Sequence, residues 1–503
     1  MKALLMHKDR NFNLQQELPW NEQELIQDLE LNTLLDAMAQ EDKFLLEVAK
    51  KAVLSSLKDQ DTIIYRQDIL KDCLKNSSIV RDIYAMAVES IETEKKNYWG
   101  IFNDYPDAIL RRSVEVLQMF MGILKKLKSI ADRYADKFDS EGFQRFFEMI
   151  KKELGDEYFA SVQNHLRELK FHDGVLISSE LGKGNKGIHY ILRKPQEEKR
   201  SWMERMFAKK TPAYSYYIAD RDESGFKALG ELRDRGVNLV ANALAQSNDH
   251  ILSFFTMLRT ELAFYVGCLN LHGRLAQKGE QMSFPLLAAL GERRHSFIGL
   301  YDVCLSLHLE QRVVGNDANA DKKDLAIITG ANQGGKSTFL RSIGLAQLML
   351  QCGMFVPAAS FCSNICDGLF THYKREEDTS MKSGKLDEEL NRMSDIINHI
   401  TPDSMVLFNE SFAATNEREG SEIGRQIVSA LMEKRIKVFF VTHLYEFAHG
   451  FYSKEMKNAI FLRAERQADG ERTFKLIEGE PLRTSFGEDL YDRIFGNTNK
   501  FGG

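Results

Sequence analysis

Apolar residues recur at helical spacing in two long stretches upstream of residue 280. The first set steps by four and three residues: Leu110, Val114, Leu117, Met121 and Leu124. The second set has similar spacing: Ile251, Phe255, Leu258, Leu262, Tyr265 and Leu269. Only eight of the 503 residues are proline, which breaks helix interiors, so long helices are permitted. We predict a helix over each stretch, with both apolar stripes as packing faces and with Asn248 or Asp249 capping the second helix.

A short β-like interruption lies between these two stretches. The runs Val175–Ser178 and Ile188–Leu192 flank Gly182, Gly184 and Gly187. This pattern predicts a β-hairpin at about residues 175–192 with a glycine-rich tip. No helix start follows these glycines, so they are expected to serve the turn rather than to bind a phosphate.

From about Phe297 the pattern changes to alternating strands and helices. Compact apolar runs predict three buried strands: 325–329, 406–408 and 438–441. Residues 337–351 are apolar nearly all round, as expected of a buried helix. A final antiparallel pair is expected on either side of a turn: 460–463 and 473–477, with Asp469-Gly470 between them. Alternation of this kind indicates a mostly parallel sheet covered by helices.

Composition places the chain among globular intracellular proteins. Hydrophobic residues make up 43% and charged residues 28% of the sequence. No apolar run approaches the roughly 20 residues needed to cross a bilayer. The six cysteines are scattered, as expected of reduced, mostly buried thiols. We therefore expect a cytoplasmic protein with no membrane partner.

The formal net charge of −6 gives no overall attraction to nucleic acid. DNA binding would therefore need local basic patches. The stretch Arg193–Lys210 is one candidate, with seven basic residues against three acidic ones. A solvated charged segment explains the same composition and is the interpretation that the sequence alone favours.

The strongest chemical signal is the segment 330–337, which reads GANQGGKS and fits the P-loop pattern G-x-x-x-x-G-K-[ST]. A predicted strand precedes it and a predicted helix follows, so backbone N–H groups and a helix N-terminus would attract phosphates. Lys336 is expected to reach the β and γ phosphates of ATP, and Ser337 to bind Mg²⁺. The alternative is a glycine-rich turn that opens a buried helix. The predicted nucleotide-binding residues are Gly330, Asn332, Gly334, Gly335, Lys336, Ser337 and Thr338.

Hydrolysis would also need a group that supports the metal and a group that orients water. The apolar run Met405–Phe408 leads directly into Asn409 and Glu410. Glu410 can polarise a water, whereas the neutral Asn409 would support Mg²⁺ more weakly than a carboxylate would. His443 ends the strand at 438–441 and is a candidate sensor of the γ-phosphate, although a histidine at a strand end is more often structural.

Taken together, these residues resemble the MutS family of DNA mismatch-repair proteins. The glycine-rich loop, continued through Thr338, is similar to the family's Gly-Pro-Asn-x-Gly-Gly-Lys-Ser-Thr. Other similar segments are Val314-Gly315-Asn316-Asp317, Gly353–Ala358, Thr442-His443 and Ser485-Phe486-Gly487. The resemblance is strong over about residues 297–496. Upstream it is weaker and rests on helical character and on Tyr65-Arg66-Gln67, which looks like the start of a core-domain helix.

The resemblance implies an α+β multidomain protein. Residues 1–279 would form a long helical core and lever region that includes the β-hairpin, and residues 280–503 an α/β P-loop ATPase domain of the ABC type. It also implies dimerisation, in which a loop of the partner completes each nucleotide site. Ser383, Gly384 and Lys385 are the candidates for that loop here. Helices around 106–136 and 226–272 would be levers that move a DNA-enclosing clamp.

Several segments depart from the family pattern. Asn409 stands where the family has Asp before its catalytic Glu, and the loop from Ser383 to Glu388 lacks the family's second serine. The chain opens directly into acidic helical sequence, so the mismatch-reading N-terminal domain is expected to be absent, and little room is left after residue 496 for a helical dimerisation segment. Phe146-Phe147-Glu148 fits the letters of the family's Phe-x-Glu wedge, but both phenylalanines are expected to be core residues of a helix.

We therefore expect a MutS-like, ATP-gated DNA-binding ATPase, acting as a homodimer on structured or damaged DNA rather than on simple mismatches, with slow hydrolysis. The alternative is a nucleotide-binding scaffold with little or no hydrolysis that recruits a protein partner. Asn409 and the altered loop at 383–388 favour the scaffold, and the presence of Glu410 argues against it. A transporter-type or chromosome-structural ATPase is disfavoured because no Leu-Ser-Gly-Gly signature occurs.

Overall fold

The structure is a computed structural model that describes residues 1–98, 105–171, 174–194, 214–215, 217–375, 384–467 and 472–483. Four features of the sequence analysis lie wholly or mostly outside these residues: the basic stretch 193–210, Ser383, Asp469-Gly470 and Ser485-Phe486-Gly487.

The chain folds into two compact units that are not separated by a single cut in the sequence. The first unit comprises Met1–Ala3, Ser78–Asp139 and Phe143–Thr260, and the second comprises Leu4–Ser77, Ser140–Gly142 and Glu261–Gly503. The N-terminal helices of residues 4–77 therefore group with the C-terminal sheet region, which nothing in the apolar pattern indicates.

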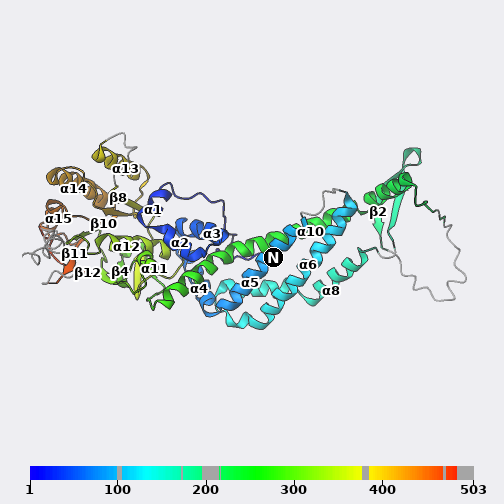
Figure 1. Ribbon diagram of the computed structural model, residues 1–503, viewed down its shortest axis with the longest axis horizontal. Helices are drawn as coiled ribbons and strands as arrows, with labels where there is room; N and C mark the ends of the chain where they lie inside the picture. The colour runs from blue at the N-terminus through cyan, green and yellow to red at the C-terminus, as the bar shows by residue number, and fades with distance from the viewer. Residues whose placement is uncertain are drawn as a thin grey trace, which may run out of the picture. The chain divides into compact units, whose positions relative to one another are not determined.

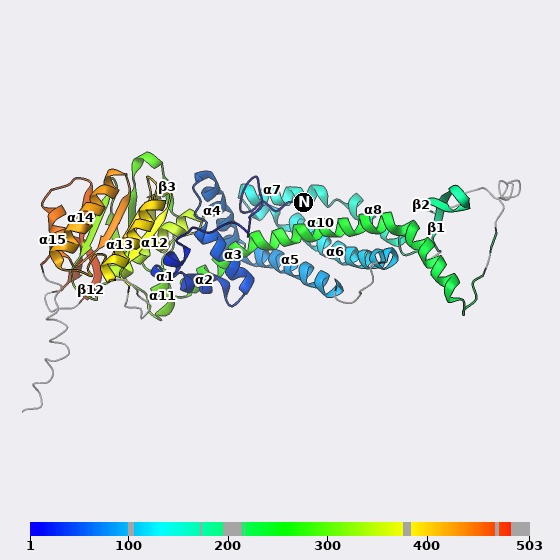
Figure 2. The same cartoon turned by 90° about the horizontal axis from the view of Figure 1, so that it is seen from above.

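The first unit is mainly helical, and its long helices run side by side (Figures 1 and 2). Its elements are α5 (Ser77–Tyr98), α6 (Pro106–Tyr134), η1 (Ala135–Lys137), α7 (Glu141–Glu153), α8 (Asp156–Glu168), β1 (Leu176–Leu181), η2 (Lys183–Asn185), β2 (Gly187–Arg193) and α10 (Glu223–Gln277). Helix α10 continues past Thr260 into the second unit. The predicted hairpin is confirmed, because β1 and β2 pair antiparallel with Ile177 opposite Leu192.

The two predicted apolar stripes are confirmed as packing faces. Every residue of the stripe on α6 and of the stripe on α10 is buried. Proline occupies the first position of α6, where the missing N–H has no helical partner to lose. Phe146 and Phe147 lie in α7 and are each 1% exposed, so they are core residues as predicted.

The predicted helix cap at Asn248 or Asp249 is wrong. Helix α10 begins at Glu223, well before this position, because the residues between them contain no proline and continue the helix. Asn248 instead points into the core of the first unit, where its side-chain amide donates a hydrogen bond to the main-chain oxygen of Ser113 at 2.9 Å. A polar side chain that looked like a cap is therefore a buried contact between two helices.

Helix α10 is also strongly apolar over part of its length, although the sequence contains no uninterrupted apolar run long enough to cross a bilayer. It holds an 18-residue window with mean hydropathy 1.3, long and apolar enough to cross a bilayer by length and composition alone. No other helix among the described residues meets that criterion. Within the protein, 72% of this window is buried, as in a helix that forms the core of a globular unit.

In the part of the chain that the structure describes, the second unit contains four N-terminal helices and two sheets. Its elements are α1 (Glu22–Asp28), α2 (Leu31–Ala39), α3 (Lys43–Leu54), α4 (Gln60–Lys75), β3 (Leu286–Ala288), η3 (Leu290–Glu292), β4 (His295–Leu300), α11 (Val303–His308), β5 (Asn316–Asn319), β6 (Leu325–Thr329), α12 (Lys336–Gln351), β7 (Ser360–Asn364), β8 (Leu369–Tyr373), α13 (Lys385–His399), β9 (Met405–Asn409), α14 (Glu417–Glu433), β10 (Lys437–Val441), α15 (Tyr445–Tyr452), β11 (Ala459–Arg466) and β12 (Arg472–Glu478).

The larger sheet is mostly parallel, as predicted. Among the described residues its strand order is β12-β11-β6-β10-β9-β8, with only β12 antiparallel to its neighbour. The expected antiparallel pair near the end is confirmed, with Ala464 opposite Leu476. The smaller sheet, β3-β7-β4-β5, was not predicted, since its strands are short and one of them reads Asn-Asp-Ala-Asn.

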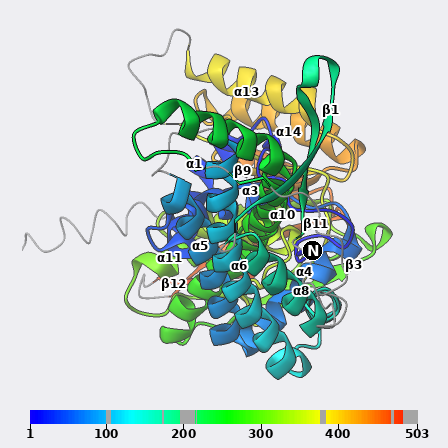
Figure 3. The same cartoon turned by 90° about the vertical axis from the view of Figure 1, so that its right-hand side faces the viewer.

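Helices cover both faces of the larger sheet. Alternate residues of β9, Val406 and Phe408, face a core that includes residues of α13, α14 and α15. Figure 3 shows α13 and α14 next to each other. Between Val406 and Phe408, Leu407 points to the other face, where it lies close to Gly344 of α12. Full burial on both faces explains why the parallel strands read as continuous apolar runs.

Candidate functional site

The carboxyl ends of three neighbouring strands meet at one edge of the larger sheet. In β6, β10 and β9 the residues Ile328, Val441 and Asn409 lie in register beside one another. The segments that follow these strands therefore come together, and they are the three segments singled out from the sequence: the glycine-rich loop, Asn409-Glu410 and Thr442-His443. Open α/β sheets place their ligand sites at this edge.

The glycine-rich loop joins β6 to α12 and needs glycine at three positions, including Gly334, where a Cβ would lie 2.7 Å from the Cβ of Ala464. Gly330 has φ of +110°, and a Cβ there would lie 2.8 Å from the backbone nitrogen of Ala464 on β11. Gly335 has φ of +85° and directly precedes the first turn of α12. A side chain at Gly330 would therefore clash with β11, and one at Gly335 would strain the backbone. The loop ends with the free backbone N–H groups of a helix N-terminus.

Lys336 is folded back over this loop. Its ammonium donates hydrogen bonds to the main-chain oxygens of Gly330 and Ala331, both at 2.9 Å. The residue is 5% exposed, and this burial lowers the pKa of its ammonium group, while the nearby Glu410 carboxylate opposes that shift. A buried cation and a helix N-terminus thus face the same space, which suits an anion.

Ser337 and Asn409 are in direct contact. The Ser337 hydroxyl donates a hydrogen bond to Oδ1 of Asn409 at 2.9 Å. Ser337 lies in the first turn of α12 and Asn409 ends β9, so the contact joins the two segments that were predicted to hold a metal. Hydroxyl and amide oxygens can both coordinate Mg²⁺, although an amide oxygen carries no formal charge.

Glu410 follows Asn409 and lies next to His443. Its Oε2 is 3.8 Å from Nδ1 of His443, and its backbone N–H donates to the main-chain oxygen of Val441 at 2.9 Å. His443 lowers the pKa of the Glu410 carboxyl, and the positive charge of Lys336 acts in the same direction. Glu410 is therefore held as a carboxylate at neutral pH, the form that can accept a proton from water.

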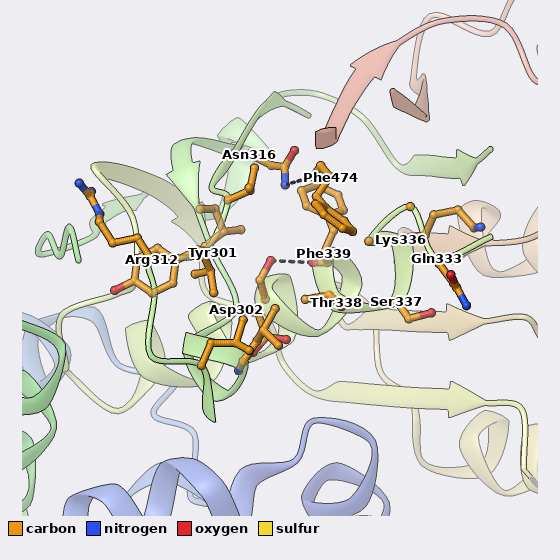
Figure 4. Close-up of a pocket in the computed structure, with 18 of the residues that line it drawn as sticks. Tyr301, Asp302, Arg312, Asn316, Gln333, Lys336, Ser337, Thr338, Phe339 and Phe474 are labelled. Atoms are coloured by element: carbon orange, nitrogen blue, oxygen red, sulfur yellow. Dashed lines mark hydrogen bonds between the residues drawn. The ribbon is translucent and has the colours of Figure 1, made fainter. Parts of the chain in front are cut away.

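Lys336, Ser337 and Glu410 border a cavity of about 540 Å³, within the range of small-molecule sites. Its polar end holds predicted residues: Asn332, Gly334, Gly335, Lys336, Ser337, Thr338 and Glu410. Its apolar wall holds residues that were not predicted: Leu300, Tyr301, Leu305, Leu309, Val313, Val314 and Phe474. Figure 4 shows Tyr301 and Phe474 on the side of the cavity away from the end of the Lys336 side chain. A ligand with one anionic and one apolar, flat part fits this division.

Asn316 closes this wall by holding β12 in place. Its side-chain amide donates to the main-chain oxygen of Phe474 at 3.2 Å (Figure 4), and its Oδ1 accepts from the backbone nitrogen of Leu476 at 2.7 Å. Asn316 was noticed in the sequence only as part of a family-like segment and was not placed at the site. Phe474 gave no sequence signal, because it comes from an antiparallel edge strand far along the chain.

The remaining predicted residues lie beside the cavity or outside it. Gly330, Asn409 and His443 do not line the cavity, but each contacts a residue that does. Gly384 and Lys385 lie at the start of α13 and are exposed, and they are not part of the cavity wall. Ser383 falls outside the described residues.

The described fold is an α+β multidomain arrangement in which a glycine-rich loop joins a parallel strand to a buried helix beside a cavity. Residues 58–278 match the family described as the MutS2 N-terminal domain, and residues 326–491 match MutS domain V. The chain belongs to the MutS-like mismatch-repair family.

Three relatives illustrate the similarity, and each is called DNA mismatch repair protein MutS. The protein of Clostridium kluyveri is 26% identical over 416 residues, which cover 77% of this chain and 47% of that protein. The Leptospira interrogans protein is 28% identical over 222 residues, or 43% of this chain and 26% of that protein. The Thermotoga neapolitana protein is 33% identical over 170 residues, or 34% and 21%. The chain therefore spans about half the length, or less, of these relatives.

Proposed function

We propose that the cavity beside the glycine-rich loop binds ATP with Mg²⁺ and that the protein hydrolyses ATP. The observation that carries this proposal is the convergence of Lys336, the Ser337–Asn409 pair and Glu410 at one sheet edge. These are the three kinds of group that phosphoryl transfer needs: a cation for the phosphates, oxygen donors for the metal and a base for water. Membership of a family of repair ATPases supports the same assignment.

The residues present fit the nucleotide and the metal. The ammonium of Lys336 would exchange its bonds to two loop carbonyls for bonds to phosphate oxygens, which carry more negative charge. The backbone N–H groups from Asn332 to Gly335 would surround the phosphates. Ser337 and Asn409 would hold Mg²⁺, which neutralises phosphate charge when bound. The base would lie against the apolar wall that includes Tyr301 and Phe474.

Glu410 would act on the attacking water. Its carboxylate is ionised at neutral pH and lines the cavity, so it can accept a hydrogen bond from a water beside the terminal phosphate and take up its proton. His443, 3.8 Å from this carboxylate, would orient it and respond to the γ-phosphate. The neutral Asn409 holds the metal more weakly than a carboxylate would, so we expect slow turnover.

We propose further that the protein works as a cytoplasmic homodimer on DNA. In this arrangement residues 280–503 form the ATPase domain, Ser383, Gly384 and Lys385 complete the partner's nucleotide site, and ATP binding closes the dimer. The helical region 1–279 would carry the motion toward a clamp on structured, damaged or mismatched DNA. The name of the relatives, DNA mismatch repair protein, supports DNA as the substrate class.

The test is steady-state ATP hydrolysis by the purified protein without DNA and with single-stranded, duplex or branched DNA. Glu410→Ala is the inactive variant, and Glu433→Ala, which changes an exposed glutamate of α14, is the matched control. A rate that DNA stimulates, that Glu410→Ala abolishes and that Glu433→Ala preserves would support the proposal.

The opposite outcome has a specific meaning. Tight ATP binding without turnover, unaffected by any of these DNAs, would contradict the ATP-gated enzyme. It would favour a nucleotide-binding scaffold that recruits a protein partner, for which the neutral Asn409 at the metal-supporting position is the structural argument.

A further inference from the structure

The backbone on which Glu410 stands is held in an unfavourable conformation. Glu410 has φ of +54° and Phe412 has φ of +63°, both in the left-handed region that residues with a side chain seldom adopt. Such a conformation persists only where the surrounding contacts enforce it. The direction of the Glu410 side chain therefore depends on what holds residues 410–412.

One of those contacts comes from α13. Oε2 of Glu389 accepts a hydrogen bond from the backbone nitrogen of Phe412 at 2.9 Å. Phe412 is fully buried and Glu389 is 5% exposed, so the bond is shielded from water. Without this carboxyl, the buried N–H of Phe412 would lose its acceptor at a point where the backbone is already strained.

His372 of β8 ties the same two segments together. Its Nδ1 lies 2.7 Å from the hydroxyl of Ser411, and its Nε2 donates to the main-chain oxygen of Glu389 at 2.9 Å. The ring also stacks on Phe412 with centroids 5.3 Å apart. Burial lowers the pKa of His372 to about 4, so the ring is neutral and Nδ1 is its accepting nitrogen. The Ser411 hydroxyl lies within hydrogen-bond distance of this nitrogen and of the main-chain oxygen of His372, the latter at 2.5 Å, and it can donate its one proton to either. Residues 411 and 412 are thus each bonded to a side chain outside their own loop.

Helix α13 reaches from this contact to the proposed partner-facing loop. It begins at Lys385, directly after Gly384, and Glu389 lies in its second turn. The helix that starts at the loop therefore also holds the segment behind Glu410. Because Glu389 is only four residues from Lys385 in the same helix, a displacement of the helix N-terminus would also displace Glu389 and change its contact with Phe412.

We propose that Glu389 is a positioning residue for Glu410, and that α13 transmits the partner's engagement of the loop at Gly384 and Lys385 to the water-activating carboxylate. The inference rests on the proposed ATPase and dimer. It adds a means of regulation: each site would be fully active only when its own protomer's α13 is seated against a partner.

The test compares kinetic constants of variants at this contact. Glu389→Ala removes the acceptor, whereas Glu389→Gln keeps an oxygen that can accept from Phe412. We expect Glu389→Ala to lower kcat at least about tenfold with little change in the dissociation constant of ATP, because a misplaced catalytic group affects the chemical step. Glu389→Gln should restore most of kcat. Asp395→Ala, an exposed change on the same helix, should match the wild type.

A second measurement covers the case in which Glu389→Ala fails to fold. Ser411→Ala removes only a hydroxyl, and we expect a smaller fall in kcat, again with unchanged ATP affinity. In hydrogen–deuterium exchange, the slowly hydrolysed analogue ATPγS should protect peptides of residues 384–392 and 409–416 together in the wild type. In Glu389→Ala and Ser411→Ala, we expect ATPγS to protect one of these two peptides without the other.

The outcomes separate this inference from the proposed function. A wild type that hydrolyses ATP and a folded Glu389→Ala with unchanged kcat would overturn the positioning role and leave the ATPase intact. Equal losses of ATP affinity and kcat would also overturn it, since they indicate a collapsed site. A wild type without hydrolysis would overturn the proposed function first, and the positioning role with it.

Discussion

The hydroxyl of Ser337 donates a hydrogen bond to Oδ1 of Asn409 at 2.9 Å, across the junction where α12 begins and β9 ends. The two residues come from separate elements, yet the parallel pairing of the sheet brings them together. An acidic residue at position 409 would present a charged oxygen to the same hydroxyl and to a metal beside it. The amide oxygen makes the same contact without the charge, and this difference can be measured.

We predict that Asn409→Asp strengthens metal use. A hydrogen bond or metal contact to a charged oxygen exceeds that to a neutral one by about 1–2 kcal/mol, so half-maximal ATP hydrolysis should need roughly tenfold less Mg²⁺. The measurement is the hydrolysis rate as a function of Mg²⁺ concentration at saturating ATP. Asn398→Asp, on the exposed surface of α13, is the matched control and should leave the curve unchanged. An unchanged midpoint in Asn409→Asp would remove position 409 from the metal site.

We predict that Gly330→Ala impairs both stability and nucleotide binding. The new Cβ would lie 2.8 Å from the backbone nitrogen of Ala464, at a φ of +110°. We expect a loss of about 1–3 kcal/mol in the free energy of unfolding, because the loop must move away from β11. Urea unfolding and titration with ATP measure the two effects.

Gly273→Ala is the control for this substitution. Gly273 lies in α10, and apart from its chain neighbours and the backbone of its own helix no atom lies within 4 Å of the position a Cβ would take. Alanine has the higher helix propensity, so this change should raise the free energy of unfolding by about 0.5–1 kcal/mol. Equal effects of the two substitutions would contradict the steric argument at Gly330.

We predict that His443→Ala shifts the pH dependence of hydrolysis. His443 lowers the pKa of Glu410, so its removal should raise that pKa and leave less carboxylate at mildly acid pH. The acid limb of kcat/KM should therefore move to higher pH, measured between about pH 4 and about pH 8. His165→Ala, an exposed change on α8, should leave the profile in place. A loss of rate that is uniform across pH would show that His443 does not act by lowering the pKa of Glu410.

The sequence predicted the centre of the site better than its walls. Lys336, Ser337 and Glu410 follow strands that are buried on both faces, and such strands are visible as apolar runs whose ends can be located. Their side chains meet because parallel strands end at one edge. Phe474 gave no such signal in the sequence, because it lies on an antiparallel edge strand. The hydrogen bond from the Asn316 side-chain amide to its main-chain oxygen holds it beside the cavity.

Long-range polar contacts were also beyond the sequence pattern. Asn248 has the residue type of a helix cap, and only the packing of α10 against α6 reveals it as a buried contact to Ser113. The bond from Phe412 to Glu389 joins residues on different elements, and neither has an unusual neighbourhood in the sequence. Periodicity reports which face of an element is buried, but not which polar group on that face finds a partner.

Glu261 is a buried glutamate in the part of α10 that belongs to the second unit, and it leads to a prediction on the pH dependence of stability. Glu261 is fully buried, and its two oxygens accept from the backbone nitrogens of Leu5 at 2.5 Å and Phe12 at 3.1 Å. Burial raises its pKa from 4.5 to about 7, although these hydrogen bonds and Arg66 act in the opposite direction. Glu261 thus holds the N-terminal segment 5–12 against α10.

Because the folded protein holds this proton to higher pH than the unfolded chain does, the contribution of Glu261 to stability is present at low pH and decreases between about pH 4.5 and about pH 7. The total decrease is on the order of 3 kcal/mol.

We therefore expect the difference in unfolding free energy between wild type and Glu261→Gln to fall by that amount over this range and to stay constant above it. Urea unfolding at a series of pH values measures the difference. Glu231→Gln, an exposed change on the same helix, should give a flat difference. A flat difference for Glu261→Gln as well would mean that the pKa of Glu261 is the same in the folded and unfolded protein, because the two backbone N–H groups and Arg66 then offset the effect of burial.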